Sequence, residues 1–349
     1  MNKLDPGKLK NWSPPESWLK ITSLDTHTEG EPLRIITSGL PEIEGDTILD
    51  RRRFMQENYD YLRTALLFEP RGHADHYGCI ITDPVTKEAD FGVIFMHNEG
   101  YSTMCGHAVI AVTKAAVESG MVKASEPETE IKIDSPAGLI TSYAKISEGK
   151  VESVRFLNVP SFVYLKDETA EVEGLGKVKF DVAFGGAFYT FVDADRLGIK
   201  MIPDNYRALI EKGMAIKHAV MSNYKIEHPT ESDLNFLYGT IFTGAPLSKN
   251  ADSRNVCIFA EGEVDRSPTG TGVSARMALQ YDRGEISKGE KYIVESILGT
   301  CFTGSIHDTV NFEGYDAVIP SVEGTAHITG KHEFLIDPDD PLKHGFFLR

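Results

Sequence analysis

Two short segments of the chain share an outline, and this internal repeat constrains the fold more than any other feature. The first segment is Met104-Cys105-Gly106-His107, and the second runs from Asp265 to Gly272. When Cys105 is aligned with Thr269, identical residues recur at three further pairs of positions: glycine at 106 and 270, valine at 109 and 273, and alanine at 111 and 275. The repeat predicts two similar halves that face one site.

The two aligned residues, Cys105 and Thr269, differ in their chemistry. Two opposed thiols would remove a proton from one face of a carbon atom and return it to the other, which is racemisation or epimerisation. A threonine hydroxyl is far too weak an acid to alternate between protonated and deprotonated forms as a thiol does. The pair therefore predicts abstraction of a proton from one side only.

The length of the chain fits two domains. Its 349 residues exceed the ~100–150 residues of an ordinary single core, and a composition of 41% hydrophobic and 25% charged residues is typical of a globular protein. We expect an α/β (α+β) fold with a first half over residues 20–152 and a second half over residues 153–334. A tail from about residue 335 to 349 is expected to return to the first half, and the order of a polar leader over residues 1–19 is left open.

Charge and cysteine usage exclude several classes of partner. A formal net charge of −16 argues against nucleic acid, whose phosphates require clustered Lys and Arg. The first 18 residues contain no apolar segment typical of a secretory signal, and no apolar run approaches the ~18 residues that span a bilayer. Four widely separated cysteines form no C-x-x-C pair. These patterns predict a cytoplasmic protein with no membrane partner and no metal; His73 and His76 have a metal-like spacing but no third ligand.

Both repeated segments lie in a strand, loop and helix pattern. Strands are predicted at Phe91–Met96 and Asn255–Ala260, and helices from about 108 to 118 and over 273–281. A single amphipathic helix is predicted over Leu49–Phe68.

A helix that begins beside Cys105 places unpaired N–H groups next to its sulfur, which lowers the pKa of a thiol. Two helix starts are able to hold a carboxylate between their N–H groups. The first start offers the N–H groups of Gly106 and His107, and the second those of Gly270 and Thr271. The glycines at 106 and 270 let the backbone approach a ligand closely. Asp265 is placed to pair with a protonated nitrogen.

Each of these residues also has a purely structural interpretation. Cys105 alone is typical of a packed core thiol, and Asp265 and Arg266 of a surface ion pair. Thr269 and Thr271 are able to hydrogen-bond the turn before a helix. His27 and Glu29 fit a solvated loop as well as a site. Only the pairing of the two loops favours the functional interpretation.

At these motifs the sequence resembles the proline racemase family, from Asp25-Thr26-His27-Thr28-Glu29-Gly30-Glu31 through the Cys105 loop to the loop of Asp265–Gly272 and Glu295-Ser296-Ile297. The resemblance implies two pseudo-symmetric halves of the diaminopimelate epimerase type that enclose a site at their interface, without cofactor and commonly as a homodimer. Racemases and hydroxyproline 2-epimerases carry cysteine where this chain has Thr269. Threonine there matches the branch that resembles trans-3-hydroxy-L-proline dehydratase.

By this resemblance, Cys105 is the proton acceptor, and the substrate carboxylate meets Gly106, His107, Gly270 and Thr271, while Asp265 meets the ring nitrogen. The implied reaction is dehydration of trans-3-hydroxy-L-proline to Δ1-pyrroline-2-carboxylate. The acid for the leaving hydroxyl stays open among Thr269, water and His27. The alternatives are an epimerase or racemase of proline or 4-hydroxyproline, and a catalytically silent protein that binds amino acids.

Overall fold

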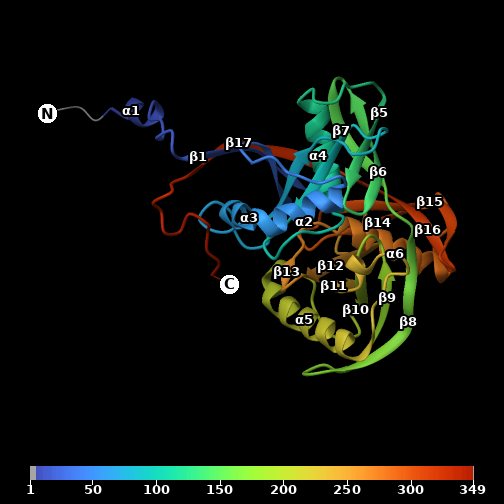
Figure 1. Cartoon of the computed structure of the whole chain (residues 1–349). Coiled ribbons are helices and arrows are strands. Elements are labelled where there is room, and N and C mark those ends of the chain that lie inside the picture. The colour runs from blue at the N-terminus through green and yellow to red at the C-terminus, as the bar shows by residue number, and fades with distance from the viewer. Residues whose placement is uncertain (1–4, 349) are drawn as a thin grey trace.

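A computed structural model describes residues 5–348 of the protein. It is rich in strands and has few helices, so the expected α+β class is confirmed (Figure 1). The helices are α1 (Gly7–Lys10), α2 (Ile48–Asn58), α3 (Asp60–Leu67), α4 (Gly106–Glu118), α5 (Tyr206–Asn223) and α6 (Gly270–Asp282), with short 3-10 turns at Pro203–Asn205 and Ser232–Leu234. None of the helices within the described residues is both long and apolar enough to cross a membrane.

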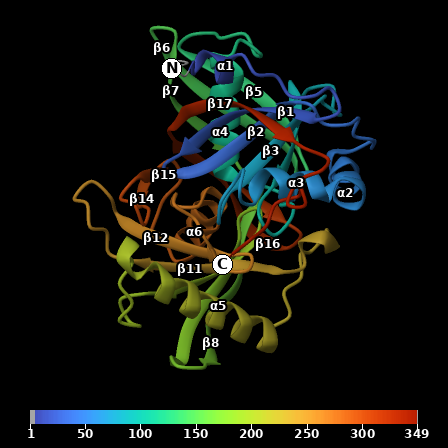
Figure 2. The ribbon, with the colours of Figure 1, turned by 90° about the vertical axis from the view of Figure 1, so that its left-hand side faces the viewer.

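The strands form two units, which lie in the upper and lower parts of Figure 2. The first unit contains β1 (Leu19–Thr28), β2 (Glu31–Ser38), β3 (Tyr77–Thr82), β4 (Phe91–Met96), β5 (Glu128–Ser135), β6 (Gly138–Ser147), β7 (Lys150–Leu157) and the last strand, β17 (Ala326–Ile336). The second unit contains β8 (Ser161–Val172), β9 (Gly176–Phe184), β10 (Phe188–Asp193), β11 (Leu237–Gly244), β12 (Ser253–Phe259), β13 (Glu263–Val264), β14 (Lys291–Glu295), β15 (Cys301–Phe312) and β16 (Tyr315–Gly324).

The two units repeat one order of strand pairing. In the first unit β2 is parallel to β3, β3 antiparallel to β4, and β4 parallel to β5. In the second unit β10 is parallel to β11, β11 antiparallel to β12, and β12 parallel to β14. Helix α4 follows β4, and α6 occupies the matching place between β12 and β14. The pseudo-symmetry predicted from the two loops is therefore a property of the whole topology.

The first unit is completed by the last strand of the chain. After β7 the chain crosses into the second unit, where β8 pairs with β9, and after β16 it crosses back to pair β17 with β1 from Ala326 to Ile336. Strands β16 and β7 pair directly and join the two sheets. The predicted boundary between residues 152 and 153 lies inside β7, and the division into two domains stays a prediction.

Helices α4 and α6 are the cores of their units. Both are buried on almost every side, as expected for helices of small and branched residues that sheets surround. Apolar residues of α4 and of α6 belong to one buried cluster together with strands of both units. This packing fixes the position of both helix N-termini.

The predicted single helix over Leu49–Phe68 is wrong, because the structure has two helices there. Tyr59 leaves the helical conformation at φ −134° and ψ 20°, and it separates α2 from α3. Thr47 and Asp50 form a capping box at the start of α2. Because apolar residues of both helices belong to the same buried cluster, the apolar pattern continues across the break between them.

The C-terminal tail lies against α3. The Phe346 N–H donates to the Glu69 carbonyl over 2.9 Å, and the rings of Phe347 and Phe68 pack with centroids 5.2 Å apart. Of the predicted leader, residues 1–4 lie outside the described residues, while α1 is exposed and stands away from the body (Figure 1).

Candidate functional site

The site lies where α4 and α6 meet end to end. A Cβ atom added at Gly106 would lie 2.8 Å from the Cα of Gly270, and a Cβ at Gly270 would lie 2.8 Å from the Cα of Gly106. Real Cβ atoms do not approach a backbone this closely. We expected glycine at these positions because it lets the backbone approach a ligand. In the structure, glycine is required first because the two helix starts contact each other.

A small cavity opens at this contact. Every residue predicted for the site lines it: Cys105, Gly106, His107, Asp265, Thr269, Gly270 and Thr271. Residues 160 positions apart in the chain are thus brought to one place, and each unit contributes one loop.

Cys105 is the N-cap residue of α4 and is 5% exposed. Its Sγ lies 3.2 Å from Nδ1 of His107. Burial first, and then the carboxylates of Asp265 and Glu31, raise the pKa of the Cys105 thiol well above its usual range, while the N–H of Ala108 acts in the opposite direction. The expected lowering of this pKa by the helix start is therefore wrong for the protein without substrate, because desolvation outweighs it.

His107 is neutral. Its complete burial lowers its pKa to about 3, although the carbonyl of Pro32 accepts a hydrogen bond from the ring. The hydroxyl of Thr28 donates to the His107 carbonyl over 2.8 Å. These bonds hold the first turn of α4 and orient the imidazole beside Cys105.

Asp265 enters the cavity from the second unit. The N–H and the hydroxyl of Ser267 both donate to Oδ1 over 2.8 Å, and the residue lines the cavity. Burial raises the pKa of Asp265, and the bonds from Ser267 oppose that rise. The structure does not place Asp265 in the surface ion pair that was its alternative interpretation. Its neighbour Arg266 instead forms an ion pair with Asp75 over 3.1 Å.

Thr269 is the N-cap residue of α6, yet its conformation is unusual. Its φ of 69° and ψ of 100° lie outside the regions that a residue with a Cβ favours. The hydroxyl Oγ1 is buried and makes no hydrogen bond of normal geometry, although it lies near enough to Asp265 and Cys257 to lower their pKa values. A buried hydroxyl without a firm partner is costly, so Thr269 is available to a ligand.

The first turns of α4 and α6 have the properties of an anion site. Neither helix has a side-chain cap, and neither carries an acidic residue in its first turn. The unpaired N–H groups and the positive ends of two helix dipoles therefore converge on the cavity. The hydroxyl of Thr271 is held by Tyr189, whose Oη lies 2.7 Å from Oγ1.

Sequence analysis missed five residues of the lining: Tyr77, Met104, Tyr189, Tyr238 and Phe259. The aromatic ones lie in apolar strands and resemble core residues. Only the hydroxyls distinguish the tyrosines, since a buried tyrosine needs a polar partner. His27, by contrast, does not line the cavity. Its Nδ1 accepts from the Gly30 N–H over 3.2 Å.

Among residues 5–348, no group of three or more His, Cys, Asp and Glu side chains is arranged to hold a metal ion. The rings of His73 and His76 pack against each other with centroids 4.4 Å apart.

Comparison with known proteins agrees with this geometry. The family model described as Proline racemase matches residues 23–347. The chain belongs to the proline racemase family.

Three known proteins illustrate how similar this chain is to other members of the family. A trans-3-hydroxy-L-proline dehydratase of Colwellia psychrerythraea is 51% identical over 98% of this chain and 97% of its own. A 3-hydroxyproline 2-epimerase of Burkholderia multivorans is 45% identical over 94% of this chain and 98% of its own. The crystal structure of a hydroxyproline epimerase from Agrobacterium vitis with bound trans-4-hydroxy-L-proline has a TM-score of 0.88 at 33% identity, and covers 95% of this chain and 96% of its own. The predicted family and fold are confirmed.

Proposed function

We propose that this protein dehydrates trans-3-hydroxy-L-proline to Δ1-pyrroline-2-carboxylate and water, with Cys105 as the base. The observation that carries the proposal is the asymmetry of the site, in which one thiol faces one hydroxyl across the junction of α4 and α6. The dehydratase relative, which is half identical over nearly the whole chain, supports the choice of substrate.

The substrate carboxylate binds to the N–H groups at the two helix starts, from Gly106 and His107 on one side and Gly270 and Thr271 on the other. The protonated ring nitrogen pairs with Oδ2 of Asp265. Two anchor points orient the ring so that C2 lies between Cys105 and Thr269. The same N–H groups stabilise the negative charge that develops on the carboxylate oxygens when C2 loses its proton.

Substrate binding also activates the thiol. Asp265 is one of the groups that raise the pKa of Cys105. A cationic ring nitrogen that pairs with Asp265 cancels this effect and places a positive charge near the sulfur. The thiolate is therefore favoured when the substrate is bound.

Dehydration then proceeds in three steps. The Cys105 thiolate takes the proton from C2, and the electrons of that bond form the bond between C2 and C3. The bond from C3 to oxygen breaks with its electron pair on oxygen, which takes a proton from an acid of the site and leaves as water. The enamine tautomerises to Δ1-pyrroline-2-carboxylate. Because Thr269 is too weak an acid to return a proton to the opposite face, inversion at C2 does not compete.

The test is to incubate the purified protein separately with trans-3-hydroxy-L-proline, trans-4-hydroxy-L-proline and L-proline. Formation of pyrroline-2-carboxylate and inversion at C2 are followed together. We expect pyrroline from the 3-hydroxy compound and no inversion of the other two. Inversion without dehydration would replace this proposal with an epimerase.

The epimerase is the second candidate, because Thr269 lines the cavity and one relative carries an epimerase name. In that case Thr269 or a water molecule returns the proton. Tight binding of all three compounds without turnover would instead support a silent binding protein. The homodimer and the cytoplasmic location implied by the resemblance stay predictions, which sedimentation and cell fractionation test.

A further inference from the structure

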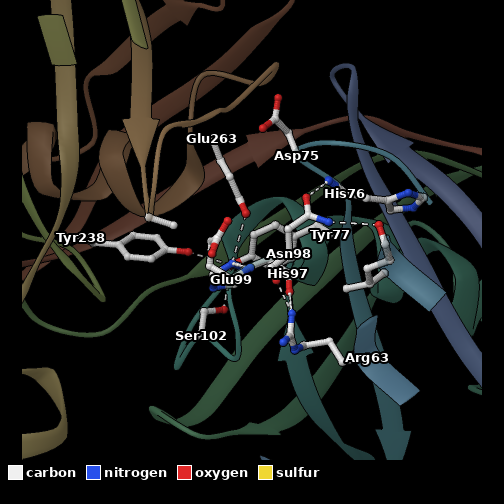
Figure 3. A network of polar contacts seen from close by, with 12 residues as sticks. Arg63, Asp75, His76, Tyr77, His97, Asn98, Glu99, Ser102, Tyr238 and Glu263 are labelled. Atoms are coloured by element: carbon white, nitrogen blue, oxygen red, sulfur yellow. Dashed lines mark hydrogen bonds and ion pairs between the residues drawn. The ribbon is translucent and has the colours of Figure 1, made fainter. Parts of the chain in front are cut away.

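A pair of buried tyrosines, Tyr77 on β3 and Tyr238 on β11, lies at the cavity and has no part in the steps above. Their hydroxyl oxygens are 3.1 Å apart, and the Tyr77 hydroxyl donates to Oγ of Ser102 over 2.8 Å (Figure 3). Both residues line the cavity, one from each unit. Two adjoining hydroxyls in the wall of the cavity are a binding place for a third hydroxyl.

The stereochemistry of the proposed substrate identifies the side on which its leaving hydroxyl lies. In trans-3-hydroxy-L-proline the carboxylate at C2 and the hydroxyl at C3 are on opposite faces of the ring. The proton at C2 is opposite the carboxylate as well, so this proton and the hydroxyl share one face. A base that removes the proton therefore lies on the same side as the leaving oxygen, and Thr269, on the other side, cannot protonate that oxygen.

The tyrosine pair lies on the side of Cys105. The Tyr77 ring packs edge to face on the His107 ring with centroids 4.9 Å apart, and Nδ1 of His107 lies 3.2 Å from the Cys105 sulfur. Tyr189, the third tyrosine of the cavity, is instead bonded to Thr271 on the side of α6. Of the three tyrosines, the pair is thus linked through His107 to the base.

We propose that the Tyr77–Tyr238 hydroxyl pair receives the 3-hydroxyl of the substrate and protonates it as it leaves, with Tyr238 as the donor and Tyr77 as the residue that positions it. The inference rests on the proposed dehydration. Tyr238 is the donor because the proton of Tyr77 already lies on its bond to Ser102, whereas the Tyr238 hydroxyl is free to turn from Tyr77 towards the cavity.

The proton balance closes within the site. Cys105 gains the proton from C2, the bond from C3 to oxygen breaks with its electron pair on oxygen, and the oxygen takes the Tyr238 proton and departs as water. The proton held on Cys105 then passes through that water to the tyrosine pair, which restores the thiolate and the phenol. Burial raises the pKa of both tyrosines, so both hydroxyls carry their protons at neutral pH.

The experiment compares two leaving groups in Tyr238→Phe and Tyr77→Phe. Fluoride leaves without a proton, so trans-3-fluoro-L-proline does not need the donor that trans-3-hydroxy-L-proline needs. We expect Tyr238→Phe to lower kcat/KM for the hydroxy substrate about 10²-fold or more, the usual effect of losing a general acid, and for the fluoro substrate less than about tenfold. Tyr77→Phe should show the same selectivity with a smaller loss.

Matched controls separate the outcomes. Tyr189→Phe removes a buried hydroxyl from the opposite side of the cavity, and it should affect both substrates by the same factor. Circular dichroism and thermal unfolding confirm that each variant is folded. Equal losses for both substrates in Tyr238→Phe, or no loss, would overturn the assignment of the tyrosine pair. Absence of pyrroline from the hydroxy substrate with the unmodified protein would overturn the proposed function, and this inference with it.

Discussion

The Cys105 loop and the Thr269 loop start from the same plan and differ in what they do. Each leads into a helix of 13 residues that begins with glycine and has no side-chain cap. Cys105 has an ordinary extended backbone at φ −144°, whereas Thr269 has a φ of 69°. The Cys105 sulfur contacts His107, while Oγ1 of Thr269 has no firm partner. Both loops therefore contribute N–H groups of a helix start to the anion site, but only the Cys105 loop carries a group that is able to act as a base.

The largest expected difference between the loops is catalytic. Cys105→Ala removes the base, and we expect kcat/KM for dehydration to fall about 10²–10⁴-fold, because no other group on that side accepts the proton. Thr269→Ala should retain most of the dehydration. Pyrroline formation by the two purified variants measures the difference, and equal losses would show that both loops take part in proton transfer.

Thr269→Cys restores the symmetry that the chain lacks. A second thiol on the opposite face is able to return a proton, so this variant should invert C2 of L-proline or trans-4-hydroxy-L-proline at a rate well above that of the unmodified protein. Chiral chromatography detects the inversion, and Thr269→Ser serves as the control because it adds no thiol. If Thr269→Cys gives no inversion, Thr269 does not face C2.

The pH dependence of Cys105 tests its environment. The thiolate is the reactive form, and burial holds the pKa of the thiol well above the usual range. Alkylation by iodoacetamide should therefore rise about tenfold per pH unit from pH 6 and continue to rise above pH ~8.5, where an ordinary thiol levels off. Mass spectrometry assigns the label to Cys105, with Cys105→Ser as the control. A plateau below pH 8 would mean that the helix start outweighs burial.

Substitution of either glycine at the contact between α4 and α6 should lower the stability of the protein by a similar amount. Gly106→Ala and Gly270→Ala each place a Cβ 2.8 Å from the opposite Cα, so we expect each to lower the free energy of unfolding by at least about 1–3 kcal/mol. Alanine in place of glycine ordinarily stabilises a helix. Urea unfolding measures the change in the free energy of unfolding, and its sign distinguishes the two effects. A gain in stability would show that the two helix starts do not contact each other.

Backbone conformation gives the smallest difference between the loops, and it should appear as a stronger preference for glycine at Thr269 than at Cys105. Both residues are N-caps, where glycine is favoured over alanine. The φ of 69° at Thr269 adds about 1 kcal/mol to this preference, whereas the extended backbone at Cys105 adds nothing. Urea unfolding of the Gly and Ala variants at each position measures the two preferences, and equal values would mean that the loops share one conformation.

The sequence was sufficient to predict which loops meet, because the repeat of glycine, valine and alanine reflects a repeat in topology. It was not sufficient for the positive φ at Thr269, since threonine is a poor indicator of that conformation. It also misled on the pKa of Cys105, because the helix start is readable from the pattern and complete burial is not. Tyr77 and Tyr238 were missed because their strands are apolar, and two strands of different units have no spacing in sequence that relates them.

The return of β17 to the first unit makes the two units inseparable in folding. Strand β1 lacks this partner until the chain has passed through the whole second unit, and α4 shares one buried cluster with strands of both units, so we expect the protein to unfold in a single cooperative transition. The crossings themselves are short, with three residues between β7 and β8 and one residue, Thr325, between β16 and β17. Because β7 and β16 are also paired with each other, the two units cannot separate without bending this pair of strands or breaking its hydrogen bonds.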